Sequence, residues 1–181
     1  MKQIKNNYKI YLLFLPIVLV ILDQVTKHLV RQSLVNPPKK VELIPGVLCF
    51  QYLENRGAVW GLFQGKYDLL SIISIGILIL FIYLMVRIPR GRRYVVMYFV
   101  MLFIVAGAIG NLIDRIVFGF VTDFIYFELI NFPIFNVADI YVTVAIFVLL
   151  YLVCFFHTDD ELSFLPFFGT DKKDNTKDES K

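Results

Sequence analysis

The sequence predicts a mainly α-helical integral membrane protein: four transmembrane helices, a small extracytoplasmic β-hairpin or sheet, and a short interfacial helix. Of the 181 residues, 58% are hydrophobic and 18% are charged, whereas about a quarter of the residues of a soluble domain are charged. Four segments also approach the length of about 20 apolar residues that a helix needs to cross a bilayer. We expect one membrane domain, residues 1–169, and a disordered cytoplasmic tail, residues 170–181, which has no apolar residue.

The four predicted spans cover approximately residues 8–30, 69–86, 94–117 and 136–156. The first span begins like a secretory signal, with basic residues before an apolar run. No small-residue cleavage pattern follows that run, so we expect a retained helix rather than a cleaved peptide.

The distribution of basic residues predicts the orientation of the spans. The link RIPRGRR, residues 87–93, holds four arginines, and lysines precede the first span. The link at residues 118–135 has neither Lys nor Arg. The first outer loop does carry basic residues, but over a far greater length. Because short cytoplasmic loops are rich in Lys and Arg, we expect both termini and the arginine-rich link to be cytoplasmic.

This orientation gathers the polar residues of the spans at one depth. The first and third spans turn polar towards their C-terminal ends, and the fourth is polar at its N-terminal end. All three of these ends lie near the outer membrane surface. The polar residues concerned are Asp23, Lys27, Asn111, Asp114, Arg115, Asn136 and Asp139.

The outer loop between the first two spans has a pattern of its own. VELIPGVLCFQYLEN, residues 41–55, consists of two short runs with β-branched and aromatic residues on either side of Pro45 and Gly46. This pattern predicts a β-hairpin. GAVWGLF, residues 57–63, is expected to form the interfacial helix, with Trp60 as its membrane anchor.

Several polar residues also have purely structural interpretations. Asp23 and Lys27 are spaced i, i+4 and would form an ion pair on one helix. Asn111, Asp114 and Arg115 share a helix face, where they would either hold helices together or bind a carbonyl or polar headgroup. The small residues of AGAIG, residues 106–110, predict close helix packing.

Asp123 and Asp139 are the candidate catalytic pair. Two carboxylates held close together do not easily both ionise, so one retains a proton at a raised pKa. One can then activate water while the other donates a hydrogen bond to a scissile carbonyl. The alternative is that Asp123 is a loop acid and Asp139 an acid favoured by the dipole at a helix N-terminus.

Other kinds of site lack a signal in the sequence. There is no HExxH or CxxC spacing, which gives no support for a metal site or a cofactor. The net charge of +3 is small and scattered, so we expect no nucleic-acid partner. Cys49 and Cys154 are expected on opposite sides of the membrane, where they could not form a disulfide.

Five segments together resemble the motifs of bacterial lipoprotein signal peptidase, also called signal peptidase II. They occur in the family's order and span most of the chain from Asp23 to Asp139. One of them, ENRGAVWG, has Val59 and Trp60 where the family often has Ala and Phe, and both changes keep the position apolar. The segments are DQVTK (23–27), ENRGAVWG (54–61), AGAIGNLIDR (106–115), VTDF (121–124) and FNVAD (135–139).

The resemblance implies an aspartic endopeptidase of the bacterial cytoplasmic (inner) membrane, with its active site near the outer face. Such an enzyme removes signal peptides from diacylglyceryl-modified prolipoproteins, cleaving just before the lipidated lipobox cysteine. The resemblance also implies inhibition by globomycin. We expect membrane lipid as a further partner and a monomeric enzyme. By motif match, the catalytic residues are Asp123 and Asp139. The expected substrate-binding residues are Asp23, Lys27, Asn55, Gly57, Asn111, Asp114, Arg115 and Asn136.

Two other classes of protein also use polar residues in a membrane. A transporter or proton channel would place them through the full depth of the bilayer, whereas the inner halves of these spans are almost entirely apolar. A structural assembly protein would not need its acids gathered at one depth.

Overall fold

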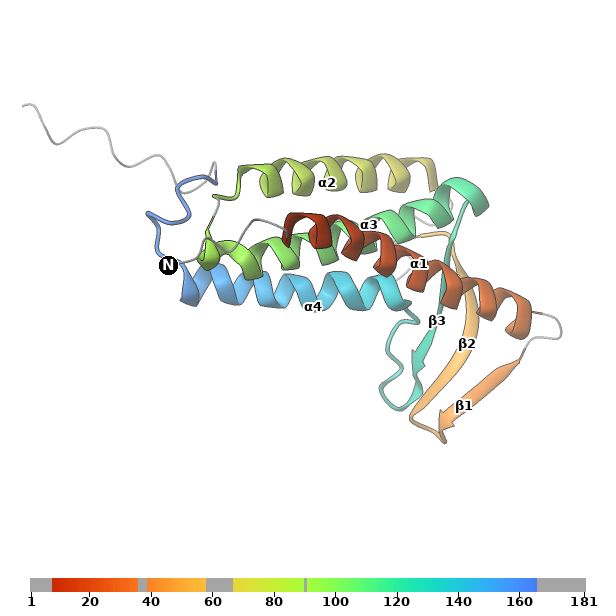
Figure 1. The fold of residues 1–181 in the computed structure, drawn as a ribbon. Helices are drawn as coiled ribbons and strands as arrows, with labels where there is room; N and C mark the ends of the chain where they lie inside the picture. The colour runs from red at the N-terminus through yellow and green to blue at the C-terminus, as the bar shows by residue number, and fades with distance from the viewer. Residues whose placement is uncertain (1–7, 36–38, 58–66, 90, 166–181) are drawn as a thin grey trace, which may run out of the picture.

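Four long helices form a bundle with a small sheet at one end (Figure 1). The computed structural model describes residues 8–35, 39–57, 67–89 and 91–165. The helices are α1 (Tyr8–Leu34), α2 (Tyr67–Arg87), α3 (Val95–Phe118) and α4 (Val137–Tyr151). Helix α3 packs against the other three helices, and α4 continues as one π-helical turn, η4 (Leu152–Phe156).

Three of these helices are long and apolar enough to cross a membrane among the residues that the structure describes. They cover Asp68–Arg87, Arg92–Phe118 and Val137–Phe156, close to the predicted second, third and fourth spans. Helix α1 forms as predicted and extends four residues beyond the predicted end at Val30. It is not among these three helices, so its crossing of the membrane stays a prediction.

The sheet contains the predicted hairpin and one strand that was not predicted. Strands β1 (Lys40–Ile44) and β2 (Leu48–Asn55) are antiparallel, and Gly46 in their turn has a φ of 67°, which glycine adopts easily. The hairpin is thus confirmed. Strand β3 (Val121–Phe127) pairs with the other edge of β2, where the sequence predicted only a loop. The predicted interfacial helix lies almost wholly outside the described residues, as does the predicted tail.

The small residues of α3 allow close contact with its neighbours, as predicted. A Cβ atom added at Gly107 would lie 2.6 Å from the Ala138 carbonyl oxygen of α4. One added at Gly110 would lie 2.5 Å from Oδ2 of Asp23 on α1. Both glycines are therefore required for the distance at which these helices pack.

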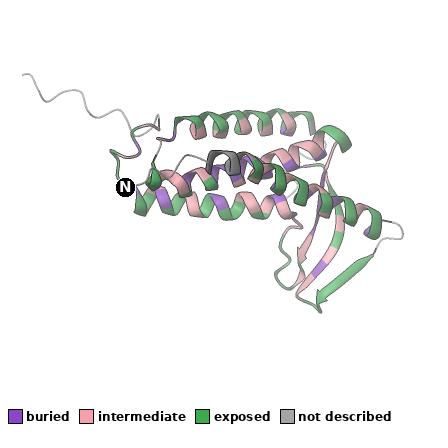
Figure 2. Cartoon of the chain, in the orientation of Figure 1, coloured by how far each residue is buried: buried purple, intermediate pink, exposed green. Residues whose placement is uncertain are grey.

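The bundle has an apolar core at the end away from the sheet. Buried side chains there include Met97, Met101 and Ile104 of α3, together with Leu152 and Leu162 from the C-terminal part of the chain. Exposed residues run along most of α2 (Figure 2), and they are largely apolar. This distribution fits a helix whose outer face contacts lipid.

Candidate active site

The two candidate catalytic aspartates come from different elements at the sheet end of the bundle. Asp123 lies on β3 and Asp139 in the first turn of α4. Asn136 is the N-cap of α4: its Oδ1 accepts a hydrogen bond from the Asp139 backbone N–H at 3.0 Å. Asp139 Oδ2 accepts in return from the Asn136 backbone N–H at 3.0 Å. This capping box fixes the Asp139 carboxylate at the helix terminus.

The Asp123 carboxylate is buried and held by two amides. Its Oδ1 accepts a hydrogen bond from Asn136 Nδ2 at 2.6 Å, and its Oδ2 accepts from Asn55 Nδ2 at 2.8 Å. Only 2% of Asp123 is exposed. Asn136 therefore contacts both aspartates and links β3 to α4.

Asn111 holds the other oxygen of Asp139. Its Nδ2 donates to Asp139 Oδ1 at 2.8 Å, while its Oδ1 accepts from Lys27 Nζ at 2.8 Å and from Asn136 Nδ2 at 3.1 Å. Because a lysine ammonium can only donate, Lys27 determines which end of the Asn111 amide is the acceptor. The amide N–H₂ must then point towards Asp139.

A fully buried ion cluster lies behind these amides. Lys27 Nζ is 2.9 Å from Asp23 Oδ2 and 3.4 Å from Asp114 Oδ2, and none of these three residues is exposed. Each acid also binds a backbone N–H of an element that carries a catalytic candidate. Asp23 accepts from Ala138 N of α4 at 3.0 Å, and Asp114 accepts from Thr122 N of β3 at 2.8 Å. The cluster thus joins α1, α3, β3 and α4.

Two of the predicted substrate-binding residues lie at the edge of this network. Arg115 donates to Ser74 Oγ of α2 at 3.2 Å, and its charge is near enough to interact with both Asp139 and Asp123. The Gly57 backbone N–H donates to Asn55 Oδ1 at 3.0 Å. That contact fixes the Asn55 amide, whose N–H₂ then faces Asp123.

Sequence reasoning missed two residues of the network, Gln24 and Arg31. Gln24 Nε2 donates to Asp23, to Asp114 and to the Gly110 carbonyl oxygen. Arg31 donates to the Thr122 hydroxyl at 2.7 Å and lies 3.7 Å from Asp114. The spacing Asp23, Lys27, Arg31 is i, i+4, i+8, so the common helix face could have identified Arg31.

The environment of Asp123 favours a protonated carboxyl group. Burial raises the pKa of Asp123, and the nearby charge of Asp139 raises it further, to about 7. The hydrogen bonds from Asn55 and Asn136 act in the opposite direction. A carboxyl group with this pKa is protonated in about half of the molecules at pH 7, whereas an ordinary aspartate is ionised there. Paired carboxyl groups of which one carries a proton can carry out acid–base hydrolysis.

The described residues contain no group of three or more His, Cys, Asp or Glu side chains placed to hold a metal ion. The buried acids Asp23 and Asp114 instead surround the ammonium group of Lys27. With Arg31 at 3.7 Å from Asp114 as the second cation, their negative charge is balanced from within the protein.

The chain is similar to known membrane peptidases over most of its length. The family described as signal peptidase (SPase) II matches residues 15–155. Lipoprotein signal peptidase of Microcystis aeruginosa is 41% identical over 135 residues, covering 72% of this chain and 83% of that protein. The enzyme of Enterococcus faecalis is 39% identical over 137 residues, covering 75% and 83%.

The fold is also similar to solved structures. One, described as a bacterial membrane enzyme determined by the in meso method, superposes with a TM-score of 0.68 at 32% identity, covering 79% of this chain and 87% of that one. A second structure with the same description gives a TM-score of 0.67 at 31% identity, covering 80% and 93%.

Proposed function

The chain belongs to the signal peptidase II family, and we propose that Asp123 and Asp139 are the groups with which it hydrolyses prolipoproteins. The observation that carries this proposal is the hydrogen-bonded link through Asn136, which holds both carboxyl groups at one end of the bundle. The reaction removes the signal peptide as a separate product.

The two aspartates have different roles in the proposed reaction. Asp139, as a carboxylate, takes a proton from a water molecule, whose oxygen attacks the scissile carbonyl carbon. Asp123, which is protonated, donates a hydrogen bond to the carbonyl oxygen as negative charge develops on it. The tetrahedral intermediate then collapses, the C–N bond breaks, and the proton held by Asp139 passes to the leaving amine.

The remaining predicted site residues divide into two groups in this proposal. Asn55, Asn111 and Asn136 orient the aspartates, and Arg115 and Gly57 lie beside them where substrate backbone would pass. Asp23, Lys27 and Asp114 are fully buried and bonded to other protein groups. We assign them the positioning of the catalytic elements rather than direct contact with substrate.

The substrate is proposed to be a diacylglyceryl-modified prolipoprotein, cleaved just before the lipidated cysteine. Support comes from the position of the dyad, Asp123 and Asp139, at the end of a bundle whose outer surface is strongly apolar. A lipidated cysteine at the membrane surface would lie at the same depth as these two residues. Globomycin-type inhibitors are expected to occupy the same site, and we expect a monomeric enzyme.

The enzyme is proposed to lie in the bacterial cytoplasmic membrane with α1 as a fourth span. Both termini would then be cytoplasmic and the dyad near the outer face. The end of α2 at Arg87 and the start of α3, next to Arg92 and Arg93, lie at the end of the bundle opposite to the sheet (Figure 1). The positive-inside rule places such basic residues on the cytoplasmic side.

A cleavage assay with defined substrates tests this proposal. The purified protein would be given one prolipoprotein with and without its diacylglyceryl group, and the products identified by mass spectrometry. We expect cleavage of the lipidated form alone, with the modified cysteine as the new N-terminus. Equal cleavage of both forms, or cleavage at another bond, would contradict the proposed substrate class.

A further inference from the structure

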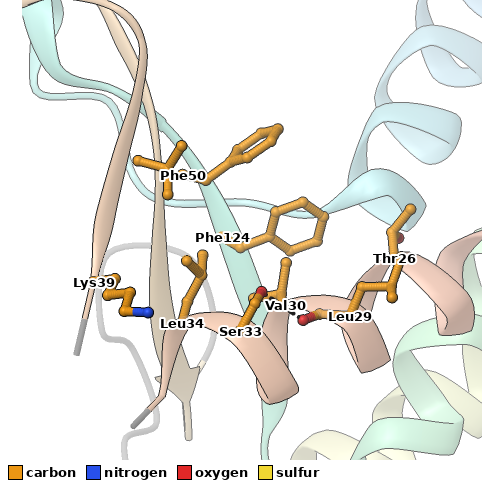
Figure 3. Close-up of a pocket in the computed structure, with 9 residues that line it drawn as sticks. Thr26, Leu29, Val30, Ser33, Leu34, Lys39, Phe50 and Phe124 are labelled. Carbon is orange, nitrogen blue, oxygen red and sulfur yellow. Dashed lines mark hydrogen bonds between the residues drawn. The ribbon is translucent and has the colours of Figure 1, made fainter. Parts of the chain in front are cut away.

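We propose that a groove between α1 and the sheet binds one anionic phospholipid, with an acyl chain against the groove walls and the phosphate beside Lys39. The groove has a volume of about 470 Å³ (Figure 3), within the range of pockets that bind small ligands. The proposal concerns a resident lipid and does not depend on the catalytic roles given above.

The walls of the groove are suited to a hydrocarbon chain. Two polar side chains in it are already occupied: the Thr26 hydroxyl donates to the Asp23 carbonyl oxygen, and the Ser33 hydroxyl to that of Leu29, both at 2.7 Å. Burying an apolar chain here therefore leaves neither hydroxyl without a partner. The apolar walls are formed by Leu29, Val30, Leu34, Val41, Phe50 and Phe124.

An exposed apolar stripe on α1 leads into the groove. Val18, Leu22, Val25 and Leu29 are each about half exposed, and their spacing of four, three and four residues places them on one helix face. Leu29 belongs to both the stripe and the groove. A chain lying in the groove could therefore continue along a surface that already faces lipid.

The groove is separate from the catalytic dyad. Phe124 lines the groove, whereas its neighbour Asp123 bonds to Asn55 and Asn136. Successive side chains of a strand point to opposite faces, and the extra residue in this part of the sheet lies in β2 rather than in β3. The groove and the dyad therefore lie on opposite sides of β3.

The charge at the groove favours an anionic phospholipid over the uncharged diacylglyceryl group of a substrate. Lys39 is exposed and forms no ion pair among the described residues. Its neighbour Lys40 is instead bound to Glu42 at 3.2 Å and Glu128 at 2.7 Å. The Lys39 backbone N–H donates to the Leu34 carbonyl oxygen at 3.2 Å, which holds this cation at the end of α1.

Native mass spectrometry with competing lipids tests the proposal. The purified protein would be incubated with equal amounts of phosphatidylglycerol and phosphatidylcholine carrying the same acyl chains. We expect one bound phosphatidylglycerol in preference to phosphatidylcholine. Lys39→Gln should bring the ratio of the two bound lipids close to one. Lys40→Gln, the matched control, should leave the wild-type ratio unchanged.

A second variant tests the groove itself. Ser33→Trp places a large side chain in the groove from an exposed position, so it should remove the bound lipid and leave prolipoprotein cleavage unchanged. Equal retention of both lipids by the wild type, or equal effects of the two lysine variants, would overturn the headgroup assignment. If Ser33→Trp still retained the lipid, the groove would be excluded as the lipid-binding site. Loss of cleavage by folded Ser33→Trp would assign the groove to the substrate's own lipid instead.

Discussion

Asn136 is the residue on which the geometry of the aspartate pair most depends. Its side-chain oxygen caps α4, its amide N–H₂ donates to Asp123, and its backbone N–H donates to Asp139. An amide side chain can do this because it accepts at its oxygen and donates at its nitrogen. An aspartate in its place would lose the donor, and an alanine would lose both functions.

Lys27 is predicted to contribute strongly to stability. The substitution Lys27→Met would leave the buried carboxylate of Asp23 without its counter-charge and Asp114 with Arg31 alone. Breaking a buried ion pair in this way costs about 3–5 kcal/mol. Thermal unfolding in detergent would show this. In a background without the exposed Cys154, a thiol-reactive dye would report unfolding when it reaches the buried Cys49. Adding Asp114→Asn to Lys27→Met should recover part of the loss. A Lys27→Met protein with wild-type stability would contradict the role of the cluster.

The dependence of cleavage on pH follows from the state of Asp123. Its pKa is raised to about 7, so raising the pH above that value removes the proton that the reaction needs. We expect the cleavage rate to fall about tenfold for each further pH unit. Cleavage rates of lipidated substrate, measured from below to above this pKa, would show the decrease. Samples returned to neutral pH before assay would control for unfolding, and a flat profile would contradict a protonated Asp123.

At the scale of elements, part of the site depends on pairings that the sequence does not display. The hairpin could be predicted because Pro45 and Gly46 separate two β-rich runs. Strand β3 was missed, although VTDFIYF is rich in β-branched and aromatic residues, because its partner β2 lies far away in the sequence. Spacing alone placed Asn111, Asp114 and Arg115 on one helix face. It did not indicate that Asp23 would cap α4 or that Asp114 would bind β3.

The close packing of α3 predicts opposite effects for two glycine substitutions. Gly110→Ala would place a Cβ atom 2.5 Å from Asp23 Oδ2, and overpacking of this kind costs about 1–3 kcal/mol. It should also reduce cleavage, because Asp23 holds the N-terminus of α4. Gly76→Ala in α2 meets nothing within 4 Å and should be neutral or stabilising, since alanine favours helix. Equal thermal stabilities of the two variants would contradict this packing.

At the scale of the whole molecule, six of the seven buried polar residues among the described ones lie at the sheet end, and His157 is the exception. The sheet end contains the aspartates and the Lys27 cluster, while the opposite end has an apolar core that includes Met97, Met101 and Leu152. The topology of alternating spans predicted this concentration, and the contacts of Asn111 with Lys27 and Asp139 confirm it. A transporter would need polar groups through the depth of the bundle, and family membership shows a peptidase instead.

The proposed orientation can be checked by labelling cysteines in intact cells. In a variant without Cys49 and Cys154, single cysteines would replace Lys2, Glu42 or Arg92. A membrane-impermeant thiol reagent should label position 42 alone, because positions 2 and 92 would face the cytoplasm. Labelling after cell lysis would show that all three sites can react. Labelling of positions 2 and 42 together in intact cells would show that α1 does not cross the membrane.

The most direct test of the central claim is the single-turnover cleavage rate of lipidated prolipoprotein by Asp123→Asn and Asp139→Asn. Asp68→Asn is the matched control, because Asp68 is an exposed acid at the start of α2. Both dyad variants should be folded and bind substrate, yet cleave about 10²–10⁴-fold more slowly than the wild type, while Asp68→Asn should cleave normally. Wild-type rates in either folded dyad variant would contradict the assignment of Asp123 and Asp139 as the catalytic pair.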